Sequence, residues 1–264
     1  LTLKSNIPIN AGISSSSAIV VAWVHFLLKA FGCDHPINQT CIAQLAYEAE
    51  VVEHHSPGGR MDQYTSSIGN IIYIDTAKDD AFQTIGTSME GLILAESGIP
   101  KQTLGLLSHL RGHATNAIAT VAKKVDNFNI AQAKLEDYEV LKGHLSEELQ
   151  PYFYAAIKNH SITQEAITAF KNKPLDHKHI GHLMSAHHQV LKDVLKITVP
   201  RIDAMIEAAL KAGAYGAKIV GSGGGGSIAA LAPPSKKLDV INAILESGAK
   251  DAYEVLVTQG TQSN

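Results

Sequence analysis

The stretch "IVGSGGGGSIAALAPP", residues 219–234, contains five glycines and a serine between two apolar runs that are typical of β-strands. Gly221 and residues 223–226 leave almost no side chain in this turn. Because glycine destabilises a helix or strand interior by roughly 0.5–1 kcal/mol relative to alanine, four consecutive glycines are costly for a plain connection. We therefore expect a ligand to approach this backbone closely, with a flexible hairpin loop as the alternative.

The layout of the turn favours a bound phosphate over two other glycine-rich sites. A dinucleotide-binding motif needs a helix directly after the glycines, whereas residues 227–232 resemble a strand. A Walker-type loop needs a Gly-Lys-Ser/Thr ending, which this run lacks. Consecutive glycine amides can still form a concave anion-binding site, and phosphate is the anion that we expect there.

The segments around the turn predict an α+β sandwich in the second part of the chain. A strand is predicted at residues 90–98, and helical sequence follows from about residue 101 to 212, with breaks near Asn127, Gln150 and Pro174. The two strands beside the glycines come next, followed by a helix at 235–247 and a last strand at 252–258. This order suits an α+β sandwich.

The first part of the chain alternates strand, loop and helix. We predict a strand at residues 1–8, a helix from about 14 to 31, and a second helix at 37–54 with Leu45, Ala49 and Val52 on one face. A short helix at 62–69 and a strand at 70–75 follow, and we place a domain boundary near residue 88. The apolar run at residues 18–28 is too short to span a bilayer, so we expect a buried core helix there.

The composition is that of an ordinary globular protein. The 264 residues carry a net charge of -3 and are 45% hydrophobic, which gives no attraction to nucleic acid or to an anionic membrane. Two cysteines, Cys33 and Cys41, favour a reduced cytoplasmic setting. Because Leu1 already lies inside a predicted strand, we expect a segment upstream of it to be missing from this chain.

A second phosphate site is predicted in "NIPINAGISSSSAIVVAW", residues 6–23, where a glycine loop opens a helix whose first turn is serine. The first amides of a helix lack internal partners and lie at the positive end of its dipole, so they bind phosphate readily. An ordinary N-cap needs one serine, whereas residues 14–17 supply four hydroxyls for capping or for magnesium.

The third element is "EAEVVEHHSPGGRMDQYTSS", residues 48–67, with Glu50 late on a helix and Asp62 after a Pro-Gly-Gly loop. An aspartate at a helix start is most often only a cap. In a chain with two predicted phosphate sites, however, Asp62 can also serve as a catalytic carboxylate. Phosphoryl transfer to a hydroxyl needs a carboxylate near that hydroxyl and a metal ion on the phosphates.

Together, these three stretches resemble the GHMP kinases, and among them most closely the galactokinases. Residues 7–18 resemble the second motif of the family, the ATP phosphate loop with its helix, and residues 218–227 resemble the third motif, the glycine turn. Residues 58–75 are similar to the galactokinase segment with the catalytic aspartate in Met-Asp-Gln, and residues 183–203 match the helical run before the third motif.

The resemblance implies a two-domain α+β fold. It places a ribosomal S5-like N-terminal domain at residues 1–88, here lacking its first part, and a ferredoxin-like C-terminal domain at residues 89–264. It implies ATP and Mg²⁺ as cofactors. The residues that it implies for binding ATP are Gly12, Ser14, Ser15, Ser16, Gly221, Ser222, Gly223 and Gly224.

The resemblance also implies roles for single side chains. Ser16 and Glu50 would ligate magnesium. Asp62 would act on the acceptor hydroxyl, as a general base or as an electrostatic anchor, and Gly59 would bring backbone close to the substrate. The first motif of the family, which supplies a basic residue near the aspartate, is not found, and the resemblance gives no reason to assign that role to Arg60.

The implied function is transfer of the γ-phosphoryl group of ATP to a hydroxyl of a sugar, by a galactokinase-like enzyme in the cytoplasm. The third motif reads "GSGGGG", which is closer to mevalonate kinases, so a mevalonate-type or sugar-phosphate kinase stays open. A galactokinase-like ligand sensor without catalysis is a further alternative. The expected partner is a sugar or related alcohol, with neither nucleic acid nor membrane, in a monomer or homodimer.

The chain contains 13 histidines, which invite a metal-binding interpretation. Five of them lie within residues 177–189: His177, His179, His182, His187 and His188. No clustered cysteine or further acidic ligand accompanies them, so we expect surface histidines on a helix.

Overall fold

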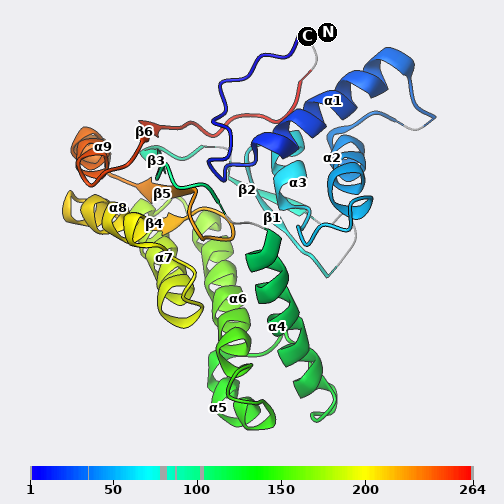
Figure 1. The fold of residues 1–264 in the computed structure, drawn as a ribbon, viewed down its shortest axis with the longest axis vertical. Coiled ribbons are helices and arrows are strands. Elements are labelled where there is room, and N and C mark those ends of the chain that lie inside the picture. The colour runs from blue at the N-terminus through cyan, green and yellow to red at the C-terminus, as the bar shows by residue number, and fades with distance from the viewer. Residues whose placement is uncertain (1, 35, 78–81, 87, 102–103, 263–264) are drawn as a thin grey trace.

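The structure, a computed structural model, describes residues 2–34, 36–77, 82–86, 88–101 and 104–262. Its helices and strands form two parts (Figure 1). In the described residues, the N-terminal part packs helices on a two-stranded sheet, and the C-terminal part packs helices on both faces of a four-stranded sheet. The predicted α+β fold is therefore confirmed.

The N-terminal part is built from α1 (Ser15–Phe31), α2 (Gln39–Tyr47), α3 (Met61–Ile68), β1 (Ile71–Ile74) and β2 (Phe82–Gly86). A π-helical turn at Glu48–Val52 continues α2. α2 begins after Asn38 because the side chain of Asn38 accepts a hydrogen bond from the amide of Cys41 at 2.9 Å. β1 and β2 pair antiparallel, and Tyr64 of α3 is buried against them. The sequence did not predict β2.

The C-terminal part contains, in chain order, β3 (Leu92–Glu96), α4 (Leu104–Ala122), α5 (Tyr138–Leu141), α6 (Gln150–Lys171), α7 (His177–Gln189), α8 (Pro200–Lys211), β4 (Gly216–Ile219), β5 (Ser227–Leu231), α9 (Lys237–Glu246) and β6 (Asp251–Glu254). Its sheet is antiparallel throughout, in the order β4-β5-β3-β6. Numbered along the chain from β3 as first, this is the order 2-3-1-4 of a ferredoxin-like sheet. The predicted ferredoxin-like domain is therefore confirmed.

The core of the C-terminal part lies between this sheet and its helices. α8 and α9 cover one face, where Ile93 and Ile228 of the sheet pack with Ile202, Met205 and Ile244, all 0% exposed. α6 and α7 lie on the other face, where their apolar residues pack with Leu92 and Leu231. The glycine turn that joins β4 to β5 therefore projects from a rigid, fully packed sheet.

The predicted strand at residues 1–8 is wrong. Residues 2–8 are not a strand, and Leu3 is 56% exposed. A strand is stable only where its amides and carbonyls have ladder partners. No strand in the described ranges lies alongside this segment.

The predicted buried core helix at residues 18–28 is also wrong. Only one side of α1 is buried, at Ser17, Val21 and His25, whereas Trp23 and Phe26 are 42% and 44% exposed and stack on each other. Packing against α2 and α3 covers that one side, so apolar sequence alone overstated the burial. Nowhere in the described residues is a helix both long and apolar enough to pass through a bilayer.

The predicted face of α2 and its extension is real, but it faces outward. Leu45 and Val52 are 37% and 46% exposed, and Ala49 on the same face is exposed too. The neighbouring face, with Ile42 and Ala46, packs against α1 instead. Helical periodicity defines a face, but only the neighbouring helices decide which face is covered.

The last described residues return to the N-terminal part. The amide of Asn70 donates to the carbonyl of Thr258 at 2.7 Å, and the amide of Thr261 donates to Ser67 at 3.0 Å. The hydroxyl of Thr261 lies 2.9 Å from Nδ1 of His25 in α1. Figure 1 shows this segment (red) passing beside α1 (blue). The boundary near residue 88 stays a prediction, and this segment links the two parts.

We predict that Gly181→Ala destabilises the fold, because α7 and β4 touch here through bare backbone. A Cβ atom at Gly181 would lie 2.5 Å from two carbon atoms of Tyr215 and 2.8 Å from the amide nitrogen of Gly216. Overpacking of this kind costs about 1–3 kcal/mol in the free energy of unfolding. The measurement is urea unfolding followed by circular dichroism. Gly105→Ala is the control, since a Cβ there meets nothing within 4 Å, and equal stability of both variants would contradict the prediction.

Candidate active site

The predicted phosphate loop leads directly into the N-terminus of α1. Ser14 is the N-cap residue, with a left-handed φ of 64° and no capping hydrogen bond from its side chain. Ser15 begins the helix, and its first turn contains no acidic residue. Ser16 is exposed and Ser17 is buried. This helix start presents the positive end of its dipole without a competing carboxylate, as an anion site requires.

The glycine turn is a run of left-handed backbone. φ is positive at all five glycines, Gly221, Gly223, Gly224, Gly225 and Gly226. A Cβ atom would lie 2.6 Å from the carbonyl oxygen of Ile197 at Gly223, and 2.9 Å from that of Ile99 at Gly225. The amide of Gly224 donates to Ile197 at 2.9 Å. Part of the reason for the glycines is therefore the close approach of the protein's own backbone.

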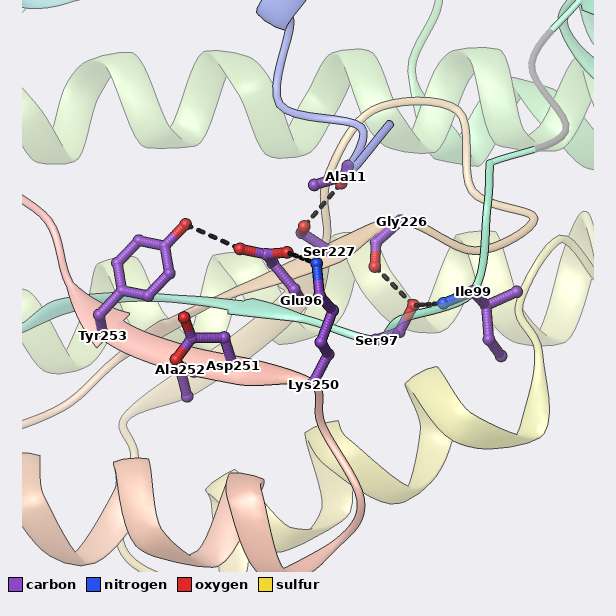
Figure 2. A network of polar contacts seen from close by, with 10 residues as sticks. All are labelled: Ala11, Glu96, Ser97, Ile99, Gly226, Ser227, Lys250, Asp251, Ala252 and Tyr253. Carbon is purple, nitrogen blue, oxygen red and sulfur yellow. Dashed lines mark hydrogen bonds and ion pairs between the residues drawn. The ribbon is translucent and has the colours of Figure 1, made fainter. Parts of the chain in front are cut away.

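The phosphate loop and the glycine turn lie against each other. A Cβ atom at Gly12 would lie 3.5 Å from Cα of Gly226, and one at Gly226 would lie 3.1 Å from the carbonyl oxygen of Ala11. The buried hydroxyl of Ser227 donates to the same oxygen of Ala11 at 2.6 Å (Figure 2). Two segments 216 residues apart in the sequence thus form one backbone surface.

A third segment, residues 97–101, completes this surface, and sequence reasoning missed it. The amide of Gly226 donates to Ile99 at 2.9 Å, and the hydroxyl of Ser97 donates to the carbonyl of Gly226 at 2.6 Å (Figure 2). The segment ends at Lys101, whose side chain reaches both Gly12 and Gly221. The sequence contains no motif for it, because a lone lysine after a proline indicates no structure by itself.

Asp62 lies in the first turn of α3, directly after the loop, and is half-buried. Asp62 lies near enough to Lys101 for its charge to act on the lysine's pKa. A Cβ atom at Gly59 would meet nothing within 4 Å, so open space lies beside this loop. The guanidinium of Arg60 lies over the rings of Tyr47 and Tyr64, at 5.8 and 5.9 Å from their centroids.

Glu50 lies in the π-helical turn after α2, and such turns are frequent at functional sites. Its carboxylate accepts a hydrogen bond of 2.6 Å from Nε2 of Gln63, which also lies 3.4 Å from the hydroxyl of the buried Ser17. The exposed Ser16 makes no hydrogen bond to this group in the described part of the chain. The metal-ligand roles of Ser16 and Glu50 stay predictions.

The prediction that the five histidines of α7 are surface residues is wrong for His188. His188 is 5% exposed, and burial lowers its pKa. Burial, with the nearby ammonium of Lys218, lowers the pKa of His187 to about 4. Burial also lowers the pKa of Lys218 to about 8. α7 packs against β4, and in this packed helix His188 is buried while His187 is only partly exposed. The described residues hold no group of three or more metal-ligating side chains.

A cavity of about 390 Å³ lies between α4 and the start of α6. It is lined by Ser108, His109, Gly112, His113, Asn116, Ser146, Glu148 and Leu149. His113 reaches Glu148 at 3.3 Å, and His109 reaches the hydroxyl of Tyr152 at 2.8 Å. Arg111 of the same helix donates to the carbonyl of Pro57 at 3.2 Å, which ties α4 to the loop that precedes Asp62.

Two family descriptions match this chain. Residues 1–70 match the GHMP kinases N terminal domain, and residues 166–250 match the GHMP kinases C terminal domain. The chain belongs to the GHMP kinases. The resemblance inferred from the phosphate loop, the glycine turn and the aspartate segment is therefore confirmed. Each matched range contains one of the two predicted phosphate loops, which the fold brings into contact.

This GHMP kinase is similar to proteins named for different acceptors. It is 30% identical to a galactokinase of Haemophilus influenzae over 267 residues, which cover 96% of this chain and 65% of the relative. It is 26% identical to a mevalonate kinase of Thermococcus sibiricus over 260 residues, which cover 98% of this chain and 67% of the relative. The chain thus spans about two thirds of the length of the curated relatives that it matches.

Solved structures support the same fold. The galactokinase of Lactococcus lactis complexed with galactose superposes with a TM-score of 0.80 at 21% identity, over 99% of this chain and 69% of that one. The mevalonate kinase of L. major in complex with R-mevalonate gives a TM-score of 0.64 at 18% identity, over 94% of this chain and 67% of that one. At these identities, the likeness concerns the fold alone.

We predict that Ser227→Ala weakens both the fold and the candidate nucleotide site of this GHMP kinase. The variant leaves the carbonyl of the buried Ala11 without its hydroxyl donor, which costs about 1–3 kcal/mol and loosens the phosphate loop from the glycine turn. Thermal unfolding and ATP titration measure both effects. Ser247→Ala is the matched control, since it loses a local hydrogen bond of 2.7 Å in α9. Unchanged ATP affinity in Ser227→Ala would contradict this account.

Proposed function

We propose that this chain transfers the γ-phosphoryl group of ATP to a hydroxyl of a small molecule. The observation that supports this most is the convergence of three segments. Gly12 packs on Gly226, and Lys101 reaches both loops while the charge of Asp62 acts on it. Phosphoryl transfer needs a group of donors that hold the phosphates and a carboxylate at the acceptor. This arrangement offers both, and we call the phosphate loop and the glycine turn together the phosphate cradle. Kinase names among the relatives agree with the proposal.

The ATP phosphates would lie on backbone amides. The residues that we propose for this are Gly12, Ser14, Ser15 and Ser16 of the phosphate loop, with Gly221, Ser222, Gly223 and Gly224 of the glycine turn. Within this set, Gly224 shapes the turn, because its own amide already donates to Ile197. Fixed amides and a helix N-terminus cost no reorganisation when charge moves, so they offset the charge that develops on the transferred group.

In the transfer step, the acceptor oxygen forms a bond to the γ-phosphorus as the bond from this phosphorus to the bridging oxygen of ADP breaks. As a general base, the carboxylate of Asp62 takes the hydroxyl proton. As an anchor, Asp62 holds the hydroxyl by a hydrogen bond, and the proton passes to the transferred phosphoryl group. The open space at Gly59 leaves room for the acceptor beside Asp62.

The residues near Glu50 suit a magnesium ion bound together with ATP. Mg²⁺ prefers oxygen ligands and is commonly held by one or two carboxylates plus substrate phosphates. Glu50 supplies a carboxylate, and Oε1 of the neighbouring Gln63 is buried without a hydrogen-bond partner in the described structure. We propose Glu50 and the hydroxyl of Ser16 as ligands, and a bound magnesium ion would neutralise charge on the phosphates.

We propose the cavity beside α4, which the hydrogen bond from Arg111 to Pro57 connects to the loop before Asp62, as part of the acceptor site, and its lining favours a sugar. Its volume of about 390 Å³ is that of a small-molecule pocket, and its described lining combines hydroxyl, amide, imidazole and carboxylate groups. No lysine or arginine belongs to that described lining, whereas a carboxylate-bearing acceptor such as mevalonate calls for a cation. We therefore propose a neutral, polyhydroxylated acceptor.

A mevalonate-type or sugar-phosphate kinase is the second candidate, because the chain is also similar to a mevalonate kinase and its glycine turn reads "GSGGGG".

The free thiols of Cys33 and Cys41 agree with a cytoplasmic location. We propose a monomer or homodimer. A ligand sensor without turnover would need neither Asp62 nor Glu50 in its site, which speaks against that alternative.

We predict that Asp62→Ala lowers kcat by about 10²–10⁴-fold, the usual contribution of a positioned acid or base. ATP affinity should stay within about threefold, because Asp62 faces the acceptor rather than the phosphate cradle. The measurements are ADP release and ATP titration. Asp75→Ala, in the same segment but after β1, is the control. Unchanged turnover in Asp62→Ala would remove Asp62 from the mechanism.

We also predict that galactose or a related sugar supports ADP release, whereas mevalonate and homoserine do not. In this assay, Glu148→Gln should raise the KM for the sugar about tenfold, since a hydrogen bond to a charged carboxylate becomes a weaker one to a neutral amide. Glu147→Gln, one residue earlier and outside the described cavity lining, is the matched control. Turnover of mevalonate with no effect of Glu148→Gln would favour the second candidate.

A further inference from the structure

Lys101 lies between the two loops that we propose for the ATP phosphates. A Cβ atom at Gly12 would lie 3.0 Å from Cδ of Lys101 and 3.6 Å from its Nζ. A Cβ atom at Gly221 would collide with the same Nζ. Both glycines therefore leave the space that the lysine side chain occupies. Its ammonium group lies where the glycine turn faces the phosphate loop.

The backbone in front of Lys101 is fixed to the glycine turn. The amide of Gly226 donates to the carbonyl of Ile99 at 2.9 Å. The hydroxyl of Ser97 donates to the carbonyl of Gly226 at 2.6 Å and accepts from the amide of Ile99 at 3.1 Å (Figure 2). Because the chain is tied down two residues before Lys101, the lysine starts from a defined point beside the turn.

The surroundings of Lys101 favour an anionic ligand. Burial lowers the pKa of Lys101, and the nearby carboxylate of Asp62 opposes this effect. Several exposed lysines of the chain pair with carboxylates, as Lys211 does with Glu207 at 2.6 Å. Within the described ranges, by contrast, no group accepts a hydrogen bond from the ammonium of Lys101. A partly buried ammonium without an acceptor is unfavourable, and a phosphate oxygen would relieve that cost.

We propose that Lys101 is a phosphate-binding residue, whose ammonium donates hydrogen bonds to the β- and γ-phosphate oxygens of ATP between Gly12 and Gly221. This inference rests on the proposed function. During transfer, no bond to Lys101 forms or breaks, and the ammonium stays protonated. Its charge offsets the negative charge on the non-bridging oxygens of the γ-phosphorus, while its neighbour Asp62 holds the acceptor hydroxyl.

The test compares ATP, ADP and AMP binding to the wild-type chain and to Lys101→Met, by calorimetric titration. Loss of a charged hydrogen bond should weaken ATP binding by about 10- to 100-fold. ADP binding should weaken less, and AMP binding should stay unchanged, because AMP lacks the phosphates that Lys101 contacts. Lys101→Arg should restore part of the ATP affinity. Lys211→Met, which removes an exposed lysine of α8, is the matched control.

The outcomes separate this inference from the function on which it rests. If the wild-type chain binds neither ATP nor ADP, the proposed function fails. If the wild-type chain binds ATP and a folded Lys101→Met variant binds all three nucleotides equally well, the role of Lys101 is overturned while the function stands. Equal weakening for ATP and AMP would also overturn it, because that pattern indicates a general structural role.

A second measurement needs no variant, and it decides the question if Lys101→Met fails to fold. Lysines of the wild-type chain are acetylated with acetic anhydride, and the labelled positions are read by mass spectrometry. ATP should protect Lys101 at least about fivefold, whereas AMP should not, and exposed lysines such as Lys211 should label equally with either nucleotide. Equal labelling of Lys101 with ATP and AMP would contradict the proposal.

Discussion

Three stretches of backbone approach each other so closely that side chains are excluded, and the candidate active site depends on this contact. Ala11 accepts a hydrogen bond from Ser227, Gly226 donates to Ile99, and a Cβ atom at Gly225 would lie 2.9 Å from the Ile99 carbonyl. The hydrogen bond from Ser227 to Ala11 is buried, so breaking it leaves an unpaired polar group at a cost of about 1–3 kcal/mol. The contact fixes the N-terminus of α1 relative to the four-stranded sheet, and a phosphate cradle built from both needs that fixed distance.

The rest of the fold supports this contact from both sides. The glycine turn projects from a sheet whose core is covered on one face by α8 and α9 and on the other by α6 and α7. On the N-terminal side, residues 258–261 bind the end of α3 and the side of α1 through Asn70, Ser67 and His25. The two parts are therefore held at the junction and again at the end of the chain. Such double attachment keeps Asp62, on α3, at a defined place relative to the phosphate loops.

Sequence reasoning succeeded where local rules decide the structure. The strands beside the glycine turn, the start of α1 near Ser15 and the short helix with Asp62 follow from glycine conformation and periodicity. It failed where a distant partner decides. The outward faces of α1 and α2, the burial of His188 and the lack of strand pairing at residues 2–8 depend on neighbours that no local pattern reveals. Lys101 escaped notice for the same reason, because its neighbours Gly12 and Gly221 lie far from it in the sequence.

In the proposed site, backbone binds the phosphates and side chains bind the acceptor. This separation explains how one fold can resemble kinases named for different acceptors. The proposed phosphate cradle is made largely of backbone, whose close approach requires the glycines and Ser227 but no side chain specific to one acceptor. The cavity, in contrast, is lined by side chains of α4 and of residues 146–149, on surfaces that do not hold the phosphate loops together. Under the proposed function, substitutions at His113 or Glu148 therefore change the acceptor without disturbing the contact between Gly12 and Gly226. A site divided in this way keeps its chemistry while its specificity varies, so acceptor preference has to be argued from the cavity and cannot be argued from the shared fold.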